Sequence, residues 1–311
     1  MNSYDVVVIG GGSAGLSAAT ALARSRRSVL VVDAGEPRNA PAAGAHNVLG
    51  HDGIAPTALL DLGRKEATGY GAEIRTDRAV AARRTDTGFE VDLDETGRVR
   101  ARRLILATGL ADELPDLPGV REAWGRSVLH CPYCHGWEVR DRRIGVIGSS
   151  PMSGHQTLMF RQLSDDVTLF THTMPAPEGE ELDRLVARGV RIVPGIVSAL
   201  RTEGDAVRAV VLDGGDEIEV DAAVVAPRFV ARAELYEQLG GTVTETPVGS
   251  FVETGPMGQT AVPGVWAAGN TADLTAMVVS AAGSGVAAGA AVNADLVAED
   301  AEAAVRERAT P

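Results

Sequence analysis

The chain has 311 residues, a length that suggests two domains at roughly 150 residues per domain. Acidic residues outnumber basic ones 42 to 29, and the resulting net charge of −13 argues against a nucleic-acid partner, whose phosphates require clustered positive charge. Aromatic residues make up only 4% of the chain, too few for base-stacking platforms.

The sequence predicts neither a membrane span nor a secretion signal. The most apolar stretch, residues 276–292, is diluted by Gly, Ser and Asn and precedes an acidic tail, whereas a spanning helix needs ~20 mainly apolar residues. The N-terminal apolar run is short, follows Asp5 and ends in glycines, unlike a signal peptide. We therefore expect a cytoplasmic protein with no membrane partner.

The first third of the chain predicts a nucleotide-binding fold. We expect a buried strand at Tyr4–Ile9, a helix at Leu16–Arg24 and a second strand at Ser28–Val32. Residues 38–53 are rich in Pro, Gly, Asn and His and predict an extended loop. After that loop the pattern predicts a helix at 56–68 and strands at 72–76, 79–84, 89–93 and 103–107.

A glycine motif lies between the first strand and the first helix. Gly10, Gly12 and Gly15 fit G-x-G-x-x-G, and Asp33 ends the second strand at the spacing of a ribose-binding acid. The glycines allow a tight turn, close approach of the backbone to a pyrophosphate, and close packing of the helix on the strand. The helix N-terminus then directs free N–H groups at the phosphates, so this segment predicts dinucleotide binding.

The only two cysteines are Cys131 and Cys134, three residues apart. A disulfide closing so short a loop adds little stability, so in a reducing compartment the pair is expected to be catalytic or metal-binding. His130 and His135 could complete a Cys2His2 zinc site, but tetrahedral closure by one short segment is awkward, and we predict redox chemistry and no metal. The same histidines could serve as acid/base groups that favour the thiolate, or as structural imidazoles.

The middle of the chain repeats the strand, glycine loop, helix and strand pattern in a degraded form. Ser150 replaces the middle glycine of the loop at 148–154, and Pro151 removes a backbone donor where phosphates need one. The following segment, Thr171-His172-Thr173-Met174, contains no Arg to pair a 2′-phosphate. We therefore predict that this domain does not bind NADPH.

The whole chain resembles the low-molecular-weight thioredoxin reductases. The shared elements are the first glycine motif, Asn47 in an Asn-x-x-Gly element, Ala107-Thr108-Gly109, the cysteine pair before a second glycine loop, and Gly269-Asn270 before the last helix. Those reductases usually carry Asp after the second cysteine and Asp in place of Asn270. The segment Cys-Pro-Tyr-Cys-His-Gly-Trp-Glu is instead similar to the dithiol oxidases of gliotoxin, holomycin and romidepsin biosynthesis.

The resemblance implies an α/β fold with two Rossmann-like (three-layer ββα) domains and a homodimer. Residues 1–115 and 233–311 would form a discontinuous FAD-binding domain, and 116–232 a degenerate NADPH-like domain that carries the cysteines. Cys134 would face the flavin, and Cys131 would exchange with substrate. The residues expected to bind FAD are Gly10, Gly12, Ser13, Ala14, Gly15, Asp33, Ala34, Arg38, Asn39, Asn47, Val80, Ala107, Gly269, Asn270, Met277 and Val278.

Without a nicotinamide donor, electrons would pass from a small-molecule dithiol through Cys131 and Cys134 to FAD and then to dioxygen, which yields hydrogen peroxide. We predict an FAD-dependent dithiol oxidase with His135 and His130 as candidate acid/base residues. Three alternatives stay open at this stage: an NADPH-dependent thioredoxin reductase, a reductase fed by ferredoxin or another protein, and a non-enzymatic redox sensor.

Overall fold

The computed structural model describes residues 2–150 and 152–309 and divides them into two compact units. The first unit holds residues up to 40, 54–111 and 229 onward, and the second holds 41–53 and 112–228. The boundaries predicted from the sequence are 115/116 and 232/233, with residues 41–53 in the FAD-binding part. Residues 41–53 belong with the second unit instead, because they are hydrogen-bonded to the cysteine segment.

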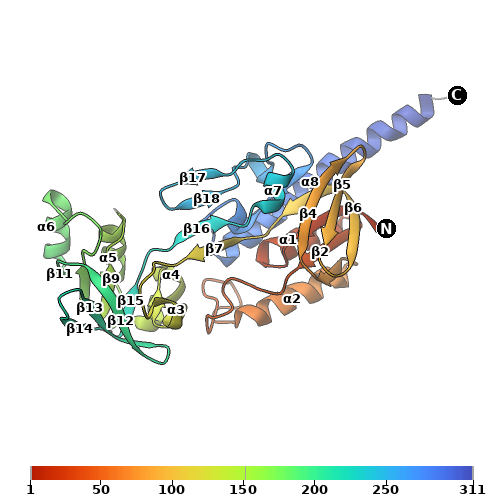
Figure 1. Cartoon of the computed structure of the whole chain (residues 1–311). Helices are drawn as coiled ribbons and strands as arrows, with labels where there is room; N and C mark the ends of the chain where they lie inside the picture. The colour runs from red at the N-terminus through yellow and green to blue at the C-terminus, as the bar shows by residue number, and fades with distance from the viewer. Residues whose placement is uncertain (1, 151, 310–311) are drawn as a thin grey trace. The chain divides into compact units, whose positions relative to one another are not determined.

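The first unit is built on a seven-stranded sheet with the order β3-β2-β1-β6-β5-β4, and β19 pairs with β6 (Figure 1). Pairs among β1, β2, β3, β6 and β19 are parallel, whereas β4, β5 and β6 form an antiparallel meander. The strands are β1 Asn2–Ile9, β2 Val29–Asp33, β3 Glu73–Thr76, β4 Ala79–Thr85, β5 Gly88–Leu93, β6 Gly97–Leu106 and β19 Val265–Ala267.

Alternating side chains of β1 build two cores. Val6 and Val8 face the helices α1 (Ser13–Arg24), α2 (Pro56–Gly69) and α8 (Val278–Ala309). Val7 and Ile9 face the other side, where the meander and α7 (Glu234–Gln238) pack. This is the period of two expected of a strand that is buried on both faces, and it confirms the predicted α/β fold class.

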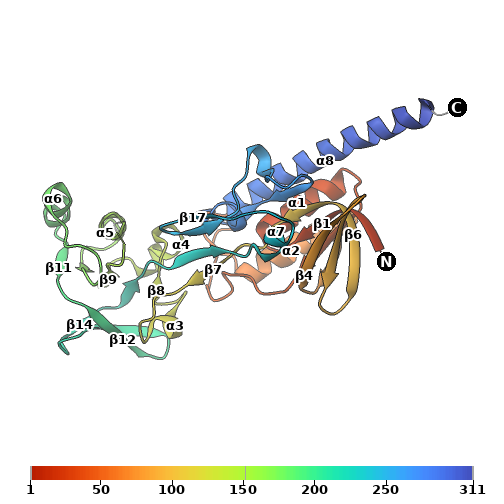
Figure 2. The same ribbon diagram turned by 45° about the horizontal axis from the view of Figure 1, so that its top comes forward.

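The long helix α8 packs directly on the backbone of α1. A Cβ added to Gly285 would lie 2.0 Å from the carbonyl oxygen of Ala14, so only glycine permits this approach. Farther along, Arg102 and Arg103 of β6 form ion pairs with Glu299 of α8. Figure 2 shows the last turns of α8 extending beyond the sheet.

By length and apolar composition alone, α8 could cross a membrane, and 33% of its apolar window is buried within the chain. The sequence analysis considered only residues 276–292, whereas the helix is continuous to 309. Its glycine-mediated packing on α1 is that of a core helix in an α/β fold. The cytoplasmic location and the homodimer stay predictions.

The second unit contains a five-stranded parallel sheet with the order β11-β10-β9-β15-β8. A three-stranded antiparallel sheet, β12-β13-β14, covers one face, and α5 and α6 contribute to a separate core. The strands are β8 Val128–Leu129, β9 Ile144–Ile147, β10 Val167–Phe170, β11 Arg191–Val193, β12 Val197–Glu203, β13 Ala206–Leu212, β14 Glu217–Glu219 and β15 Ala222–Val224, and the helices are α3 Val120–Ala123, α4 Pro132–His135, α5 Ser153–Arg161 and α6 Gly179–Ala187.

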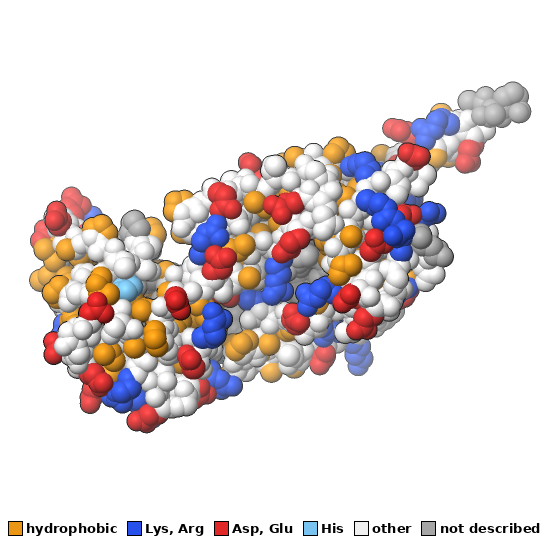
Figure 3. Space-filling view, in the orientation of Figure 1, with side chains coloured by type: hydrophobic (Ala, Val, Ile, Leu, Met, Phe, Trp, Pro, Cys, Tyr) orange, Lys and Arg blue, Asp and Glu red, His pale blue; other side chains and the backbone are white. Residues whose placement is uncertain are grey.

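The chain passes between the units at β7 (Leu110–Glu113) and β16 (Arg228–Ala231), which join β17 (Thr244–Thr246) and β18 (Gly249–Phe251) in a four-stranded sheet. On the face drawn in Figure 3, acidic and basic side chains are interspersed. Most of the described arginines form ion pairs with neighbouring carboxylates, as Arg143 does with Asp221.

Candidate active site

Cys134 lies on the short helix α4, and Cys131 is the N-cap residue directly before it. The backbone N–H of Cys134 donates a 3.2 Å hydrogen bond to Sγ of Cys131. Pro132 occupies the first helical position, where a missing N–H costs nothing. An N–H aimed at a sulfur favours its thiolate form, so the local fold stabilises Cys131 as a thiolate, the form in which it leaves a mixed disulfide.

His130 is held in one orientation by the second unit. Its Nδ1 lies 3.0 Å from the carbonyl oxygen of Val225, and because a carbonyl only accepts, Nδ1 carries the proton. The side-chain amide of Gln156 donates a 2.7 Å hydrogen bond to the backbone carbonyl of His130. Gln156 of α5 therefore anchors the residue before the first cysteine, a role that the sequence pattern did not reveal.

His135 has the properties of a neutral base. Its Nε2 is buried and has no hydrogen-bond partner among the described residues. Burial lowers the pKa of His135 below the usual value of 6.5; the nearby Glu138 carboxylate opposes this shift, and His46 adds to it. A neutral imidazole with an unused nitrogen can accept a thiol proton, which suits His135 better than His130 for that role.

The loop at 41–53, called the strap below, contacts this cysteine segment. The Asn47 side-chain amide donates a 2.9 Å hydrogen bond to the carbonyl oxygen of Tyr133, between the two cysteines. His46 Nε2 lies 3.3 Å from a carboxylate oxygen of Glu138. Asn47 has a left-handed backbone with φ +60°, which Asn tolerates better than most residues. Of the residues expected to bind FAD, Asn47 alone lies in the second unit.

The first glycine loop forms a cradle in the first unit. A Cβ on Gly10 would lie 2.2 Å from the carbonyl oxygen of Ala107, and one on Gly15 would lie 1.9 Å from that of Gly10. A Cβ on Gly12 would meet no atom of the chain within 4 Å, and Gly12 gives α1 no side-chain cap. The uncapped N–H groups of Ser13 and Ala14 at this open point fit the pyrophosphate of FAD.

Asp33 ends β2 beside this cradle. Its carboxylate accepts a 2.6 Å hydrogen bond from Arg64 of α2, a partner that the sequence analysis did not identify. A Cβ on Gly11 would lie 2.5 Å from the same carboxylate, so the loop and the acid are tightly packed. Asp33 is thus held in place by a cation while its remaining acceptor capacity is available to a ribose hydroxyl.

The late Gly-Asn element folds as a short 3-10 turn, Gly269–Thr271, rather than as the end of a strand. Gly269 has φ +69°, and a Cβ there would lie 2.8 Å from the Cβ of Ala14. The Asn270 amide donates to the carbonyl oxygens of Asp273 and Ala276, at 2.9 and 3.0 Å, and so holds the loop before α8. Met277 is 38% exposed at the start of α8, whose N-terminus carries partial positive charge.

The other expected FAD contacts lie on loops and edges of the first unit. Val80 is 45% exposed at an irregularity in the pairing of β4 with β5. The Arg38 guanidinium lies 5.2 Å from the centroid of the Phe229 ring, while Ala34 and Asn39 lie in the loop after β2. Side-chain contacts with FAD at these positions, and at Val278, stay predictions.

The second glycine loop differs from the first. The backbone N–H groups of Ser149 and Ser150 approach the Ser153 hydroxyl oxygen at 3.3 and 3.2 Å. A Cβ on Gly154 would lie 1.9 Å from a carboxylate oxygen of Glu181, so an acid stands at the N-terminus of α5. Pro151 lies outside the described residues.

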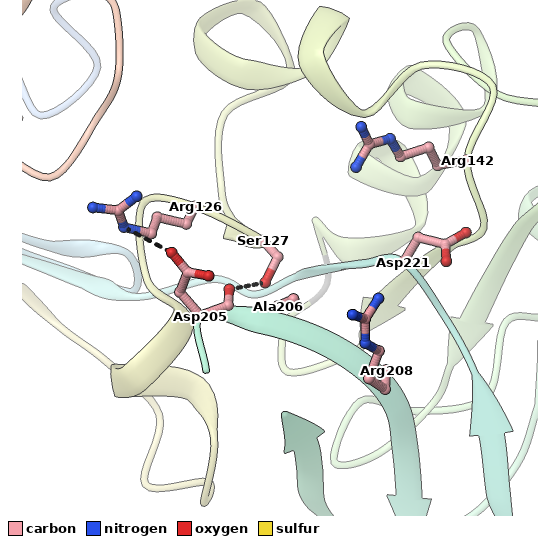
Figure 4. A pocket seen from close by; sticks show the side chains of 7 residues that line it. All are labelled: Arg126, Ser127, Arg142, Asp205, Ala206, Arg208 and Asp221. Atoms are coloured by element: carbon pink, nitrogen blue, oxygen red, sulfur yellow. Dashed lines mark hydrogen bonds and ion pairs between the residues drawn. The ribbon is translucent and has the colours of Figure 1, made fainter. Parts of the chain in front are cut away.

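A surface cavity of about 400 Å³ occurs elsewhere in the second unit (Figure 4). It lies before β8, β9 and β15, at the amino ends of these parallel strands, whereas the cysteines follow the carboxyl end of β8. The two carboxylates that line it already form ion pairs, Asp205 with Arg126 and Asp221 with Arg143. We therefore do not assign the thiol chemistry to this cavity. Within the described residues no three metal-ligating side chains cluster.

Residues 4–289 match the model of the pyridine nucleotide-disulphide oxidoreductase family. The chain belongs to this family. It is 34% identical to thioredoxin reductase tcpT of Claviceps purpurea over 96% of each chain, and 34% identical to thioredoxin reductase sirT of Leptosphaeria maculans over 93% of each. The crystal structure of HlmI superposes with a TM-score of 0.91 at 46% identity, covering 99% of this chain and 96% of that one.

Membership in this family confirms a thioredoxin reductase-like thiol/disulfide oxidoreductase and implies FAD, which the cradle around Gly12 fits. An oxidoreductase of known structure from Agrobacterium tumefaciens, at 38% identity and TM-score 0.90, covers 96% of this chain and 99% of its own. The similarity therefore extends over the discontinuous first unit and the second unit, including the segment with both cysteines.

Proposed function

We propose that this flavoenzyme is a dithiol oxidase, which closes a disulfide in a small-molecule dithiol of the natural-product type and uses dioxygen as final acceptor. The observation that carries the proposal is the thiol segment itself. Cys131 receives an N–H at its sulfur, and the buried Nε2 of His135 has no hydrogen-bond partner among the residues that the structure describes. This arrangement supports thiol exchange without any further protein partner.

The chemistry begins with the oxidised pair. One substrate thiolate attacks Sγ of Cys131, which forms a mixed disulfide and releases Cys134 as a thiolate. The second substrate thiolate then displaces Cys131, so the substrate leaves as a disulfide and the pair holds two electrons. His135 accepts a thiol proton at Nε2. The cradle around Gly12 would hold FAD, which would supply a two-electron carrier between the reduced pair and dioxygen. Dioxygen would then take up two electrons and two protons as hydrogen peroxide.

The second unit supports electron entry from a dithiol rather than from NADPH. Ser153 already accepts from the loop N–H groups that a pyrophosphate would use, and Glu181 adds negative charge there. His172 stands where a 2′-phosphate would need a cation. Its Nδ1 accepts from the N–H of Val197 at 3.0 Å, and burial lowers the pKa of His172, so its ring is neutral.

The deciding experiment is anaerobic reduction of the flavin by two donors in parallel. A small cyclisable dithiol should bleach the flavin absorbance band rapidly, and readmitted air should restore it with one equivalent of hydrogen peroxide. NADPH should leave the band unchanged over the same time. Rapid bleaching by NADPH would instead favour a thioredoxin reductase, the activity named for the two fungal relatives. Bleaching by reduced ferredoxin alone would favour the protein-fed alternative.

A further inference from the structure

His46 of the strap lies between two carboxylates. Its Nδ1 is 3.3 Å from Oδ2 of Asp52, and its Nε2 is 3.3 Å from Oε1 of Glu138. A neutral imidazole carries one N–H and can donate to only one of these oxygens, whereas the imidazolium donates to both. The ring, when protonated, can therefore bridge both carboxylates, and the His46 side chain is only 27% exposed.

Hydrogen bonds within the strap close it into a turn, so its residues hold fixed positions relative to one another. Asp52 accepts a 2.8 Å hydrogen bond from the N–H of Asn47. The N–H of Gly53 donates to the carbonyl oxygen of Ala45 at 2.9 Å. These two hydrogen bonds fix the positions of His46 and Asn47, because each joins the first half of the turn to its second half.

The strap is attached to the cysteine segment at two points on opposite sides of His135. Asn47 binds the carbonyl oxygen of Tyr133, two residues before His135, and His46 binds Glu138, three residues after it. The described neighbours that act on the charge of His135 are Glu138 and His46. A single strap thus fixes the backbone around His135 and supplies one of the two charges beside it.

We propose that His46, held between Asp52 and Glu138, is a positioning residue for His135. It fastens the strap to the cysteine segment on both sides of His135 and, when protonated, places a positive charge beside the Glu138 carboxylate. The inference rests on the proposed function only for the role of His135 as a base.

Substitution of His46 and substitution of Glu138 should shift the pKa of His135 in opposite directions. Glu138 raises the pKa of His135 and His46 lowers it. Replacing His46 with Gln should therefore raise the pKa of His135, and replacing Glu138 with Gln should lower it. His51 is an exposed imidazole on the same strap, and His51→Gln is the matched control, expected to leave the pKa of His135 unchanged.

The experiment is a pH titration of the six histidine rings by NMR in the FAD-loaded protein. Amide hydrogen exchange of residues 45–53 is measured alongside, and His46→Gln should speed it about fivefold, the loss expected from one exposed or half-buried ion pair. An unchanged His135 titration in His46→Gln, or an equal change in His51→Gln, overturns the inference. If the titrations follow the expected signs but the wild-type enzyme oxidises no dithiol in air, the proposed function fails and the positioning role stands.

Discussion

The side-chain amide of Asn270 donates a hydrogen bond of 3.0 Å to the carbonyl oxygen of Ala276, just before α8 begins. The same nitrogen donates to the carbonyl oxygen of Asp273 at 2.9 Å. A carboxylate has no N–H, so the Asp found at this place in thioredoxin reductases could not hold the loop in this way. The departure from the family pattern therefore has a local structural cause.

We predict that Asn270→Asp destabilises the chain by about 1–3 kcal/mol, because both donated bonds are lost and a charge then faces two carbonyl oxygens. Urea unfolding of the wild type and the variant measures the difference, and flavin retained after gel filtration measures the effect on the cofactor. The control is Asn293→Asp on the far part of α8, where the amide oxygen accepts from Arg27 and a carboxylate could do the same. Equal stability of Asn270→Asp and the wild type would contradict this role.

The two cysteines should respond differently to substitution. Cys131→Ser should abolish dithiol oxidation and form no mixed disulfide with substrate, because the proposed attacked sulfur is gone. Cys134→Ser should also abolish turnover, yet its Cys131 should remain the more reactive thiol because the N–H of residue 134 still points at it. Alkylation kinetics and mass spectrometry of each variant decide the point. Faster alkylation of Cys134 in Cys131→Ser than of Cys131 in Cys134→Ser would reverse the assignment.

The pH dependence of the dithiol oxidation rate should follow the protonation of His135. Burial lowers the pKa of this imidazole, so it stays neutral and able to accept a proton until the pH falls below the ordinary histidine value of 6.5. The rate of dithiol oxidation should therefore decline only on the acidic side of that value. His135→Asn should remove this decline and slow the reaction about 100-fold. His155→Asn, at an exposed position on α5, should leave the profile unchanged.

The glycine cradle offers a matched pair of substitutions. Gly15→Ala places a Cβ 1.9 Å from a backbone oxygen and should destabilise the fold as well as lose FAD. Gly12→Ala meets no atom of the chain, so we expect a normally folded protein whose flavin content drops at least tenfold. Circular dichroism and the ratio of flavin to protein absorbance separate the two effects. Full flavin content in Gly12→Ala would show that the pyrophosphate does not approach at this point.

Asp77 should contribute stability that depends on pH. Burial alone would raise the pKa of its carboxyl, but hydrogen bonds from Thr96 and from the backbone N–H groups of Glu95 and Arg78 lower it to about 2. Because this value lies below that of the unfolded chain, the contribution is complete above pH ~4 and disappears as the pH falls toward 2. Asp77→Asn should lose about 1–3 kcal/mol at pH 7 and about half as much at pH 3, measured by urea unfolding at both values.

Local patterns in the sequence were sufficient for much of the fold. The apolar run before Gly10 predicted β1, and Asp33 ends β2 as expected. These features depend on residues that are close together in the sequence, so the pattern of apolar residues predicts them directly. The helix α1 begins three residues earlier than predicted, at Ser13, because the glycine loop itself closes its first turn.

The sequence alone determined three features: the spacing of the cysteines, the glycines of the first loop, and the residues that replace glycine in the second loop. Each of these depends only on residue type at fixed intervals along the chain. Only the tertiary structure showed that the strap belongs with the cysteine segment, with Asn47 on Tyr133 and His46 on Glu138, and that Asn270 holds the loop before α8. Asn47 and Tyr133 are 86 residues apart in the chain, and no local pattern encodes a hydrogen bond over such a separation. Likewise, the pKa of His135 is lowered only when folding buries the ring, with Nε2 unpaired among the described residues, because solvation and neighbouring charge, rather than residue type, set a pKa.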